Sequence, residues 1–344
     1  MKPNLNKAIA KAVLFPQKPS HLILHVTGRC TQRCRTCFID FDSYKEKDDL
    51  SLAEIKNIAA YLDSLVWLDL SGGEPFLRKD LPEICAAFNV PAISIPTNGF
   101  NPDIIAQTTK RIKESSNSEV CIAVSLDGFE ATNDYIRAPG AFGRVIKTIE
   151  ALKKIEGIRI KVNTVLCNKN LGEIIDFMKF IKGFELDFHS IIFQRGSQPA
   201  NDFLCPSAEK LLEIKDKIFE IWKTYDYGVR GFGRVVLQSY QKELYNASLK
   251  VMQEKQQIPK CLAHNKHLVI YPHGEAAFCE MLPCFGNIRQ VPLKELLLSS
   301  NAQKQRQSIK QKKCYCYHNC NMIDNFFFNP FLYPKVILSS IWPR

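Results

Sequence analysis

The strongest constraint on the fold is an alternation of short apolar runs with helix-length amphipathic stretches, which occurs six times along the chain. The runs are rich in β-branched residues and read HLILHV (21–26), VWLDLS (66–71), AISIPT (92–97), VCIAVS (120–125), IRIKVNTV (158–165) and DFHSIIF (187–193). Such alternation predicts βα units around a parallel sheet. Six units of this length favour an incomplete barrel over an open Rossmann-type sheet, so we expect an α/β fold with a partial (β/α)6 TIM-like barrel.

Two helix starts can be predicted between these runs. Ser51 with Glu54, and Asn170 with Glu173, have the spacing of a capping box. In that motif each of the two side chains binds the backbone N–H of the other residue. Both pairs therefore predict the N-terminus of a helix.

The segments that follow the six runs are all polar or rich in glycine. In order they are the cysteine-containing loop 28–39, SGGEP (71–75), PTNG (96–99), SLDG (125–128), NTVLCNKN (163–170) and QRGSQ (194–198). Loops are often polar simply because they face water. In barrels of this kind, however, the loops at the carboxyl ends of the strands build the active site, so we expect a site at this end.

Three cysteines, Cys30, Cys34 and Cys37, lie in the loop after the first run with the spacing C-x3-C-x2-C. The chain has 13 cysteines, an odd number that rules out complete pairing, and it shows no export signal. Metal binding is therefore favoured over disulfides. Three thiolates on a cubane iron–sulfur cluster leave one iron open to another ligand. A zinc site that borrows a distant fourth ligand is the alternative.

The segment CTQRCRTC (30–37), followed at the next strand end by SGGEP, resembles the radical S-adenosylmethionine (SAM) enzymes, and the similarity continues through SLDG. The resemblance implies that Cys30, Cys34 and Cys37 hold a [4Fe–4S] cluster whose open iron is chelated by the amino and carboxylate groups of SAM. One electron then releases methionine and a 5′-deoxyadenosyl radical, which abstracts a hydrogen atom from an organic substrate.

The same resemblance implies further contacts to SAM. They are made to the methionine amino group by the turn Gly72, Gly73, Glu74 and Pro75, to adenine by Phe38, to ribose by Asn98, and to the carboxylate by Ser125 and Arg137. The structural alternatives are a plain tight turn, a core aromatic and a solvated arginine. Asp127 is expected to shape its turn together with Gly128.

A second group of cysteines lies near the C-terminus. Cys261 and Cys279 flank a segment that contains Gly274, and C-x-C-x3-C follows at Cys314, Cys316 and Cys320. This resembles the SPASM and twitch modules, although the last group departs from the full SPASM pattern. The resemblance implies one auxiliary [4Fe–4S] cluster held by Cys261, Cys279 and two of the last three, with Cys284 as a spare candidate. A zinc site built from the same residues is the alternative.

Glu280 follows Cys279 directly and occupies the position of a carboxylate base in the sulfatase-maturating branch. The resemblance implies that it takes a proton as the substrate radical is oxidised, for a net two-electron oxidation. An ordinary surface glutamate is the alternative.

The chain divides into a basic N-terminal segment (1–20), the barrel (21–225), a helical linker (226–257), the cysteine-rich module (258–325) and an apolar tail (326–344). No run of about 18 apolar residues occurs, so we expect a cytoplasmic protein. The prolines of the tail exclude one straight spanning helix. The tail either packs on the body or lies at a membrane interface, which Trp342, Tyr333 and Lys335 also suit.

The formal charge of +11 is compatible with several anionic partners. Nucleic acid is disfavoured, because no arginine-rich block with interleaved aromatics occurs. A flavodoxin or ferredoxin that supplies electrons fits the charge and the implied chemistry. The substrate stays unidentified among a peptide, a lipid and a small acidic metabolite. A non-enzymatic zinc scaffold or nucleic-acid-binding module is the competing function.

Overall fold

The computed structural model describes residues 5–14, 18–39, 49–196, 200–311 and 314–341. Its nine-stranded sheet has the order β6-β5-β4-β3-β2-β1-β7-β8-β9. The first six strands pair in parallel and in chain order, which confirms the predicted α/β fold. They are β1 (His21–Thr27), β2 (Trp67–Gly72), β3 (Ala92–Thr97), β4 (Glu119–Ser125), β5 (Arg159–Leu166) and β6 (Phe188–Phe193).

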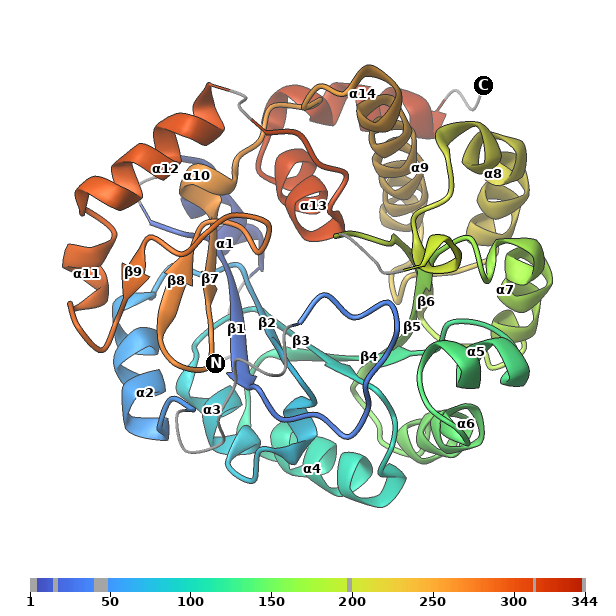
Figure 1. The fold of residues 1–344 in the computed structure, drawn as a ribbon, viewed down its shortest axis with the longest axis horizontal. Helices are drawn as coiled ribbons and strands as arrows, with labels where there is room; N and C mark the ends of the chain where they lie inside the picture. The colour runs from blue at the N-terminus through green and yellow to red at the C-terminus, as the bar shows by residue number, and fades with distance from the viewer. Residues whose placement is uncertain (1–4, 15–17, 40–48, 197–199, 312–313, 342–344) are drawn as a thin grey trace.

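Helices surround the curved sheet on its outer side (Figure 1). Along the barrel these are α2 (Leu52–Tyr61), α3 (Leu81–Ala87), α4 (Pro102–Ser115), α5 (Glu130–Ile136), α6 (Ala141–Leu152), α7 (Ile174–Lys182) and α8 (Ala208–Lys223), with the short 3-10 helices η3 (Pro75–Leu77), η4 (Leu171–Glu173) and η5 (Asn201–Phe203). Strand residues such as Leu22, Leu24 and Leu68 pack with these helices in one core. Because successive residues of a strand alternate between faces, His21 and His25 lie on the opposite, inner face.

The two predicted capping boxes have different outcomes. At α2 the prediction is confirmed, because Ser51 N–H donates to Glu54 Oε2 at 2.7 Å and Glu54 N–H donates to Ser51 Oγ at 3.3 Å. At Asn170 the predicted helix start is confirmed, because η4 begins at Leu171, but the capping box does not form. The Asn170 amide instead accepts from the N–H of Cys167 and donates to the carbonyl of Asp127, both at distances near 2.9 Å. The Asn170 side chain therefore holds the buried loop in place and does not cap the helix.

The C-terminal part of the chain continues the barrel sheet. β7 (His267–Ile270) pairs in parallel with β1, and β8 (Glu275–Ala277) and β9 (Gly286–Asn287) follow in antiparallel order. The remaining helices are α1 (Leu5–Leu14), α9 (Phe232–Glu254), α10 (Ala263–Lys266), α11 (Leu293–Leu296), α12 (Ser300–Lys310), α13 (Asn319–Phe327), η6 (Pro330–Leu332) and α14 (Tyr333–Ile341). In Figure 1, α13 points toward the middle of the ring.

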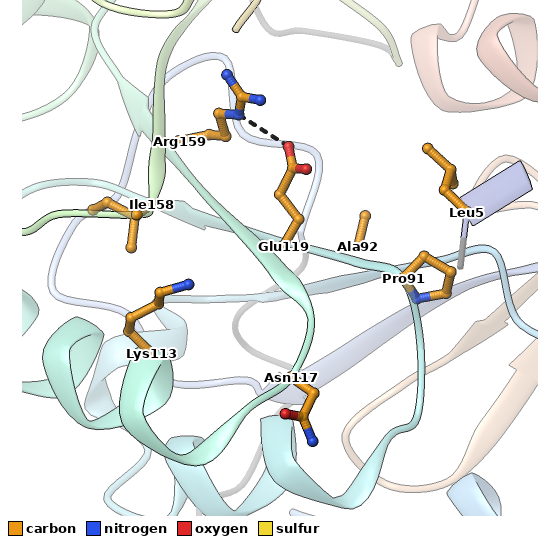
Figure 2. Close-up of a pocket in the computed structure, with 9 residues that line it drawn as sticks. Leu5, Pro91, Ala92, Lys113, Asn117, Glu119, Ile158 and Arg159 are labelled. Carbon is orange, nitrogen blue, oxygen red and sulfur yellow. Dashed lines mark hydrogen bonds and ion pairs between the residues drawn. The ribbon is translucent and has the colours of Figure 1, made fainter. Parts of the chain in front are cut away.

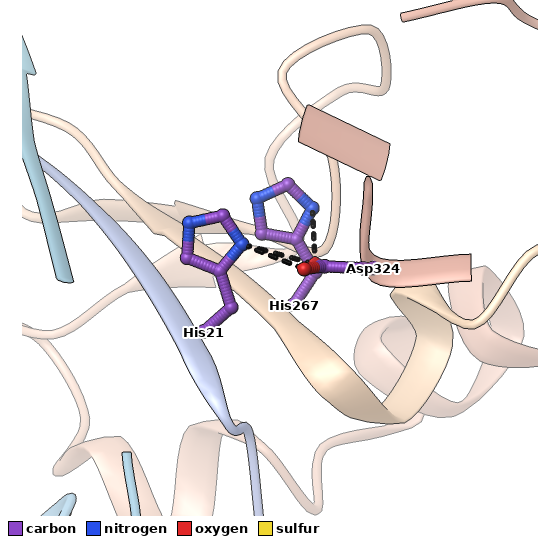
Figure 3. Close-up of side chains that lie close together, drawn as sticks. All are labelled: His21, His267 and Asp324. Atoms are coloured by element: carbon purple, nitrogen blue, oxygen red, sulfur yellow. Dashed lines mark hydrogen bonds and ion pairs between the residues drawn. The ribbon is translucent and has the colours of Figure 1, made fainter. Parts of the chain in front are cut away.

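A buried ion pair joins α13 to the barrel (Figure 3). Both carboxylate oxygens of Asp324 lie 3.0 Å from His21 Nδ1, and Asp69 Oδ2 lies 3.0 Å from His21 Nε2. Burial alone would lower the pKa of His21, but Asp324 and Asp69 outweigh burial and raise it to about 10. His21 is therefore a cation that connects β1, β2 and α13.

His21, His267 and Asp324 lie close enough together to suggest a metal site, but the ring geometry opposes it. The two imidazole rings are stacked, with centroids 4.8 Å apart and planes within 6° of each other. An ion bound by a ring nitrogen lies near the plane of that ring, about 2.0–2.1 Å away, and one ion cannot lie in two parallel planes. The cluster is an ion pair.

The tail packs on the body through one side of α14. Val336 is buried against Leu244 and Val251 of α9, and Lys335 Nζ lies 2.6 Å from Glu243 Oε2. On the outer side, Phe331 and Leu338 are 89% and 65% exposed. Trp342 lies outside the described residues. In the ranges that the structure describes, no helix has the length and apolarity needed to cross a membrane.

We expect Asp324→Asn to destabilise the protein by about 3 kcal/mol, because it leaves His21 with one carboxylate fewer in a buried site. The raised pKa of His21 stabilises the folded state fully below pH 6.5, and this contribution is lost as the pH rises toward about 10. In the variant that pH dependence should shrink. Urea unfolding of the metal-free protein across this range measures both effects. Lys179→Ala, which breaks the exposed pair with Asp176, serves as the control and should cost less than about 1 kcal/mol.

Candidate active site

The three cysteines of the first loop lie together at the open end of the sheet. Figure 1 shows the segment that follows β1 crossing the middle of the ring of helices. Burial raises the pKa of Cys30, Cys34 and Cys37, and the charge of another thiol in the set raises each pKa further. Three half-buried thiols at such close quarters fit a metal cluster, because a bound cation removes their protons and their mutual repulsion.

The loop after β2 holds the cysteine loop by its backbone. Gly73 N–H donates to the Thr27 carbonyl at 2.9 Å, and Glu74 N–H donates to the Arg29 carbonyl at 2.8 Å. A Cβ atom on Gly72 would lie 2.3 Å from the Thr27 oxygen, and one on Gly73 would lie 2.0 Å from the Arg29 oxygen. The two glycines are thus required by the close approach of the cysteine loop, an effect that the sequence alone does not reveal.

Glu74 ties the same loop to the end of β3. Its buried carboxylate accepts from the N–H of Asn98 at 2.7 Å and from Thr97 Oγ1 at 2.9 Å. Burial raises the pKa of Glu74 to about 7 despite these donors. Asn98 in turn donates through Nδ2 to Thr31 Oγ1 at 3.0 Å and to Cys30 Sγ at 3.5 Å. Pro75 begins η3 and ends the turn.

Arg137 lies against the second cysteine of the triplet. Its Nη1 atom lies 3.8 Å from Cys34 Sγ, and its Nε atom lies 2.8 Å from Asp127 Oδ2 in a buried ion pair. Asp127 also accepts from the N–H of Val165 at 2.8 Å, so it does more than shape its turn. Ser125 ends β4 opposite Asn163 of β5. The structure therefore places Arg137 at the cysteine loop. Among the described residues, Arg137 and Ser125 make no contact with each other.

Phe38 and Arg195 connect the cysteine loop to the end of β6. The Arg195 guanidinium carbon lies 3.7 Å from the centre of the Phe38 ring, a stacked cation–π contact. Phe38 is still 42% exposed, so it is not a core aromatic. The only sequence signal for Arg195 is its place in the polar loop QRGSQ.

Glu280 is the centre of a buried charge cluster at the barrel mouth. Its side chain is 3% exposed and accepts from Arg195 Nη1 at 3.0 Å and from His25 Nε2 at 3.1 Å, and His318 Nε2 lies 3.3 Å from its Oε2. Burial opposes its charge, but Arg195, His25 and His318 hold the pKa of Glu280 well below its usual range. An ionised Glu280 makes each Nε2 the donor. The Nδ1 atoms of both histidines are then acceptors, buried and unpartnered within the part of the chain described.

In the C-terminal part of the chain four thiols interact electrostatically with one another, while the thiol of Cys320 lies within 4.8 Å of ligand atoms of Glu280 and His318. Charges on Cys316, Cys279 and Cys314 add to burial in raising the pKa of Cys261, and burial with Cys316 raises that of Cys279 to about 12. The charged neighbours of Cys320 are instead Asp69, Glu280, Arg195 and Asp324. Cys284 is exposed. The four gathered thiols match the donor set of a cubane cluster.

A hollow of about 460 Å³ lies at the other end of the barrel (Figure 2). It is lined by Ala92, Glu119 and Arg159, the first residues of β3, β4 and β5, and Glu119 pairs with Arg159 at 3.0 Å. Because the cysteine loops lie at the carboxyl ends of the strands, this hollow is remote from the thiols. Two of its charged groups, Glu119 and Arg159, are paired with each other.

Two family models match the chain. The model of the radical SAM superfamily matches residues 24–181, and the SPASM model, an iron–sulfur cluster-binding domain, matches residues 261–321. Together they cover both groups of cysteines.

Two relatives come from Methanosarcina barkeri. Fe-coproporphyrin III synthase is 30% identical over 241 residues, and the match covers 64% of this chain but only 58% of that relative. AdoMet-dependent heme synthase is 25% identical over 322 residues, with coverage of 88% and 89%. Among solved structures, anSMEcpe with bound AdoMet has a TM-score of 0.63 at 14% identity, over 94% of this chain and 95% of that chain. The last comparison shows a shared fold.

We expect Gly73→Ala to displace the cysteine loop, because the added Cβ meets the Arg29 carbonyl. The metal-free protein should lose about 3 kcal/mol of stability, and less iron should bind after anaerobic reconstitution. Gly143→Ala is the matched control, since a Cβ there meets nothing within 4 Å in the first turn of α6. It should gain about 0.5–1 kcal/mol. Equal iron content in both variants would contradict the role given to Gly73.

Proposed function

Because the chain belongs to the radical SAM superfamily and carries a C-terminal SPASM domain, we propose that it cleaves SAM reductively and abstracts a hydrogen atom from an organic substrate. The observation that carries this proposal is the convergence of Cys30, Cys34 and Cys37 in one loop, held by the backbone of Gly73 and Glu74. When bound, the [4Fe–4S] cluster supplies one electron to the sulfonium of SAM.

The residues around the triplet are proposed to bind SAM. Phe38 for adenine and Asn98 for ribose are supported by their places beside Cys37 and Cys30. Arg137 for the carboxylate is supported by its position at Cys34, where Asp127 orients the guanidinium. Ser125 at the end of β4 completes this set. Gly72, Gly73 and Pro75 shape the turn from which backbone atoms meet the methionine amino group, and Glu74 braces it.

We propose one auxiliary [4Fe–4S] cluster, held by Cys261, Cys279, Cys314 and Cys316. Their mutual proximity supports this set, and the separate surroundings of Cys320 support its exclusion. With four thiolates, the cluster has no open iron for substrate and serves to carry electrons.

We propose that Glu280 and His25 together remove the proton that the substrate loses in the net oxidation. The substrate loses one hydrogen atom to the deoxyadenosyl radical, one electron to the auxiliary cluster and one proton to the protein, which balances as a two-electron oxidation. Two hydrogen-bond donors and the nearby His318 weaken Glu280 as a base, whereas the unpartnered Nδ1 of His25 offers a free lone pair beside it. In this arrangement Glu280 orients the imidazole and His25 takes the proton.

The partners follow from the charge and from the family. Radical SAM enzymes need a reductant, and the net charge of +11 supports docking of an acidic flavodoxin or ferredoxin. We propose a cytoplasmic location with peripheral membrane contact through the exposed side of the tail. The name of one relative gives iron coproporphyrin III as that enzyme's product, so iron porphyrin precursors are the first substrates to test, beside GTP, lipids and precursor peptides.

Anaerobically reconstituted protein should bind about eight iron atoms per chain and form 5′-deoxyadenosine from SAM under reducing conditions. Cys34→Ala should lower 5′-deoxyadenosine formation at least a thousandfold, because the first site loses a ligand. Cys284→Ser changes an exposed thiol outside both groups and should leave the rate unchanged. Zinc without iron in the purified protein would favour the competing zinc-scaffold function.

The exposed side of the tail should bind anionic vesicles. Phe331→Ser combined with Leu338→Ser should reduce co-sedimentation with such vesicles severalfold, because these side chains leave the packing of α14 on α9 intact. Leu298→Ser is the control, since Leu298 is 66% exposed on another part of the surface. If the double variant and the control sediment equally, the membrane contact is wrong.

A further inference from the structure

Asn321 lies between the predicted auxiliary cluster and the barrel. It is on α13 and is 1% exposed. Its amide nitrogen donates to Cys279 Sγ at 2.9 Å and lies 3.9 Å from Cys316 Sγ. These are two of the four thiols that gather in the C-terminal part of the chain, so one buried side chain aims its donor at two predicted ligands.

His267 determines which end of the Asn321 amide faces the sulfurs. The Nδ1 atom of His267, the first residue of β7, lies 2.5 Å from Asn321 Oδ1. An amide oxygen can only accept, so His267 donates. A reversed amide could bond to His267 only if Nδ1 carried no proton, which the Asp324 carboxylate 3.8 Å from Nδ1 opposes, and it would place its oxygen against two thiolates. The orientation with the N–H groups toward sulfur is therefore the stable one.

The helix that carries Asn321 is held in place independently. Asp324, one turn later on α13, is paired with His21 of β1, and Asn325 Oδ1 accepts from the N–H of Leu262 at 2.7 Å. The donor is thus positioned before any cluster binds, because its supports come from β1, β7 and the segment before α10.

We propose that Asn321 is a positioning residue that raises the reduction potential of the auxiliary cluster, an inference that rests on the proposed function. Reduction adds negative charge to the cluster and its sulfurs, and a hydrogen-bond donor aimed at those sulfurs stabilises the reduced state. A higher potential makes the cluster a better acceptor for the electron that the oxidised substrate releases. His267 contributes by holding the amide in its donating orientation.

The test uses the full chain with Cys30, Cys34 and Cys37 changed to alanine, so that only the auxiliary centre can form. In this parent, Asn321→Leu removes the donor, and Asn321→Asp keeps the shape while it places an acceptor against the sulfurs. Both should shift the midpoint potential to more negative values in an EPR-monitored redox titration, with the larger shift for Asn321→Asp. His267→Leu should give a smaller shift in the same direction.

Asn325→Leu is the matched control. Asn325 is buried on the same helix and its amide nitrogen lies near Met322 Sδ, which is not a predicted ligand. This variant removes one support of the helix but leaves the donor in place, so we expect its midpoint potential to move much less than that of Asn321→Leu, even where stability falls. An equal shift in Asn325→Leu and Asn321→Leu would show a general disturbance of the helix and would overturn the inference.

Two further outcomes are distinguishable. If the parent holds its iron–sulfur centre and neither Asn321 variant shifts the potential, the inference fails while the proposed auxiliary cluster stands. If the parent binds zinc or no metal, the proposed auxiliary cluster fails, and the tuning role of Asn321 fails with it. Iron and zinc analysis of each sample separates these cases before the titration.

Discussion

The whole site depends on one backbone contact, in which the cysteine loop lies directly against the loop after β2. Two hydrogen bonds from Gly73 and Glu74 to the carbonyls of Thr27 and Arg29 make this contact. It is possible only because positions 72 and 73 have no Cβ. The contact fixes the position of Cys30, Cys34 and Cys37 relative to the carboxyl ends of the strands. Glu74 then extends the same support to β3, so three consecutive strand ends act as one frame for the thiols.

A second constraint brings the C-terminal module to the same frame. β7 adds to the sheet beside β1, and the His21–Asp324 pair holds α13 against the inner face of the barrel. The module is therefore not attached through its metal site alone. As a consequence Glu280, which follows Cys279, contacts Arg195 from the loop after β6 and His25 from β1. The buried carboxylate of Glu280 thus contacts residues of the barrel and of the C-terminal module. It lies between the two groups of cysteines.

Local patterns predicted well wherever a structure depends on neighbours in sequence. The sequence predicted the six strands, the start of α2 and the grouping of the cysteines. The pairing of Arg137 with Asp127, the stacking of Arg195 on Phe38 and the contacts of Glu280 were missed. The failed capping box at Asn170 has the same cause, since its side chain is claimed by Asp127 and Cys167 from a neighbouring loop. Period-two alternation in HLILHV could have placed His25 on the inner face, but not beside Glu280.

By itself the sequence determined the class of fold and the end of the barrel that carries chemistry, because these follow from periodicity along the chain. The kind of metal group followed from the resemblance of the cysteine motifs to a known family. Only the tertiary structure decided which thiols of the second group gather, which charges pair and which way the Asn321 amide points. Those properties arise from side chains far apart in sequence, and burial makes their charges and hydrogen bonds depend on every neighbour that excludes water.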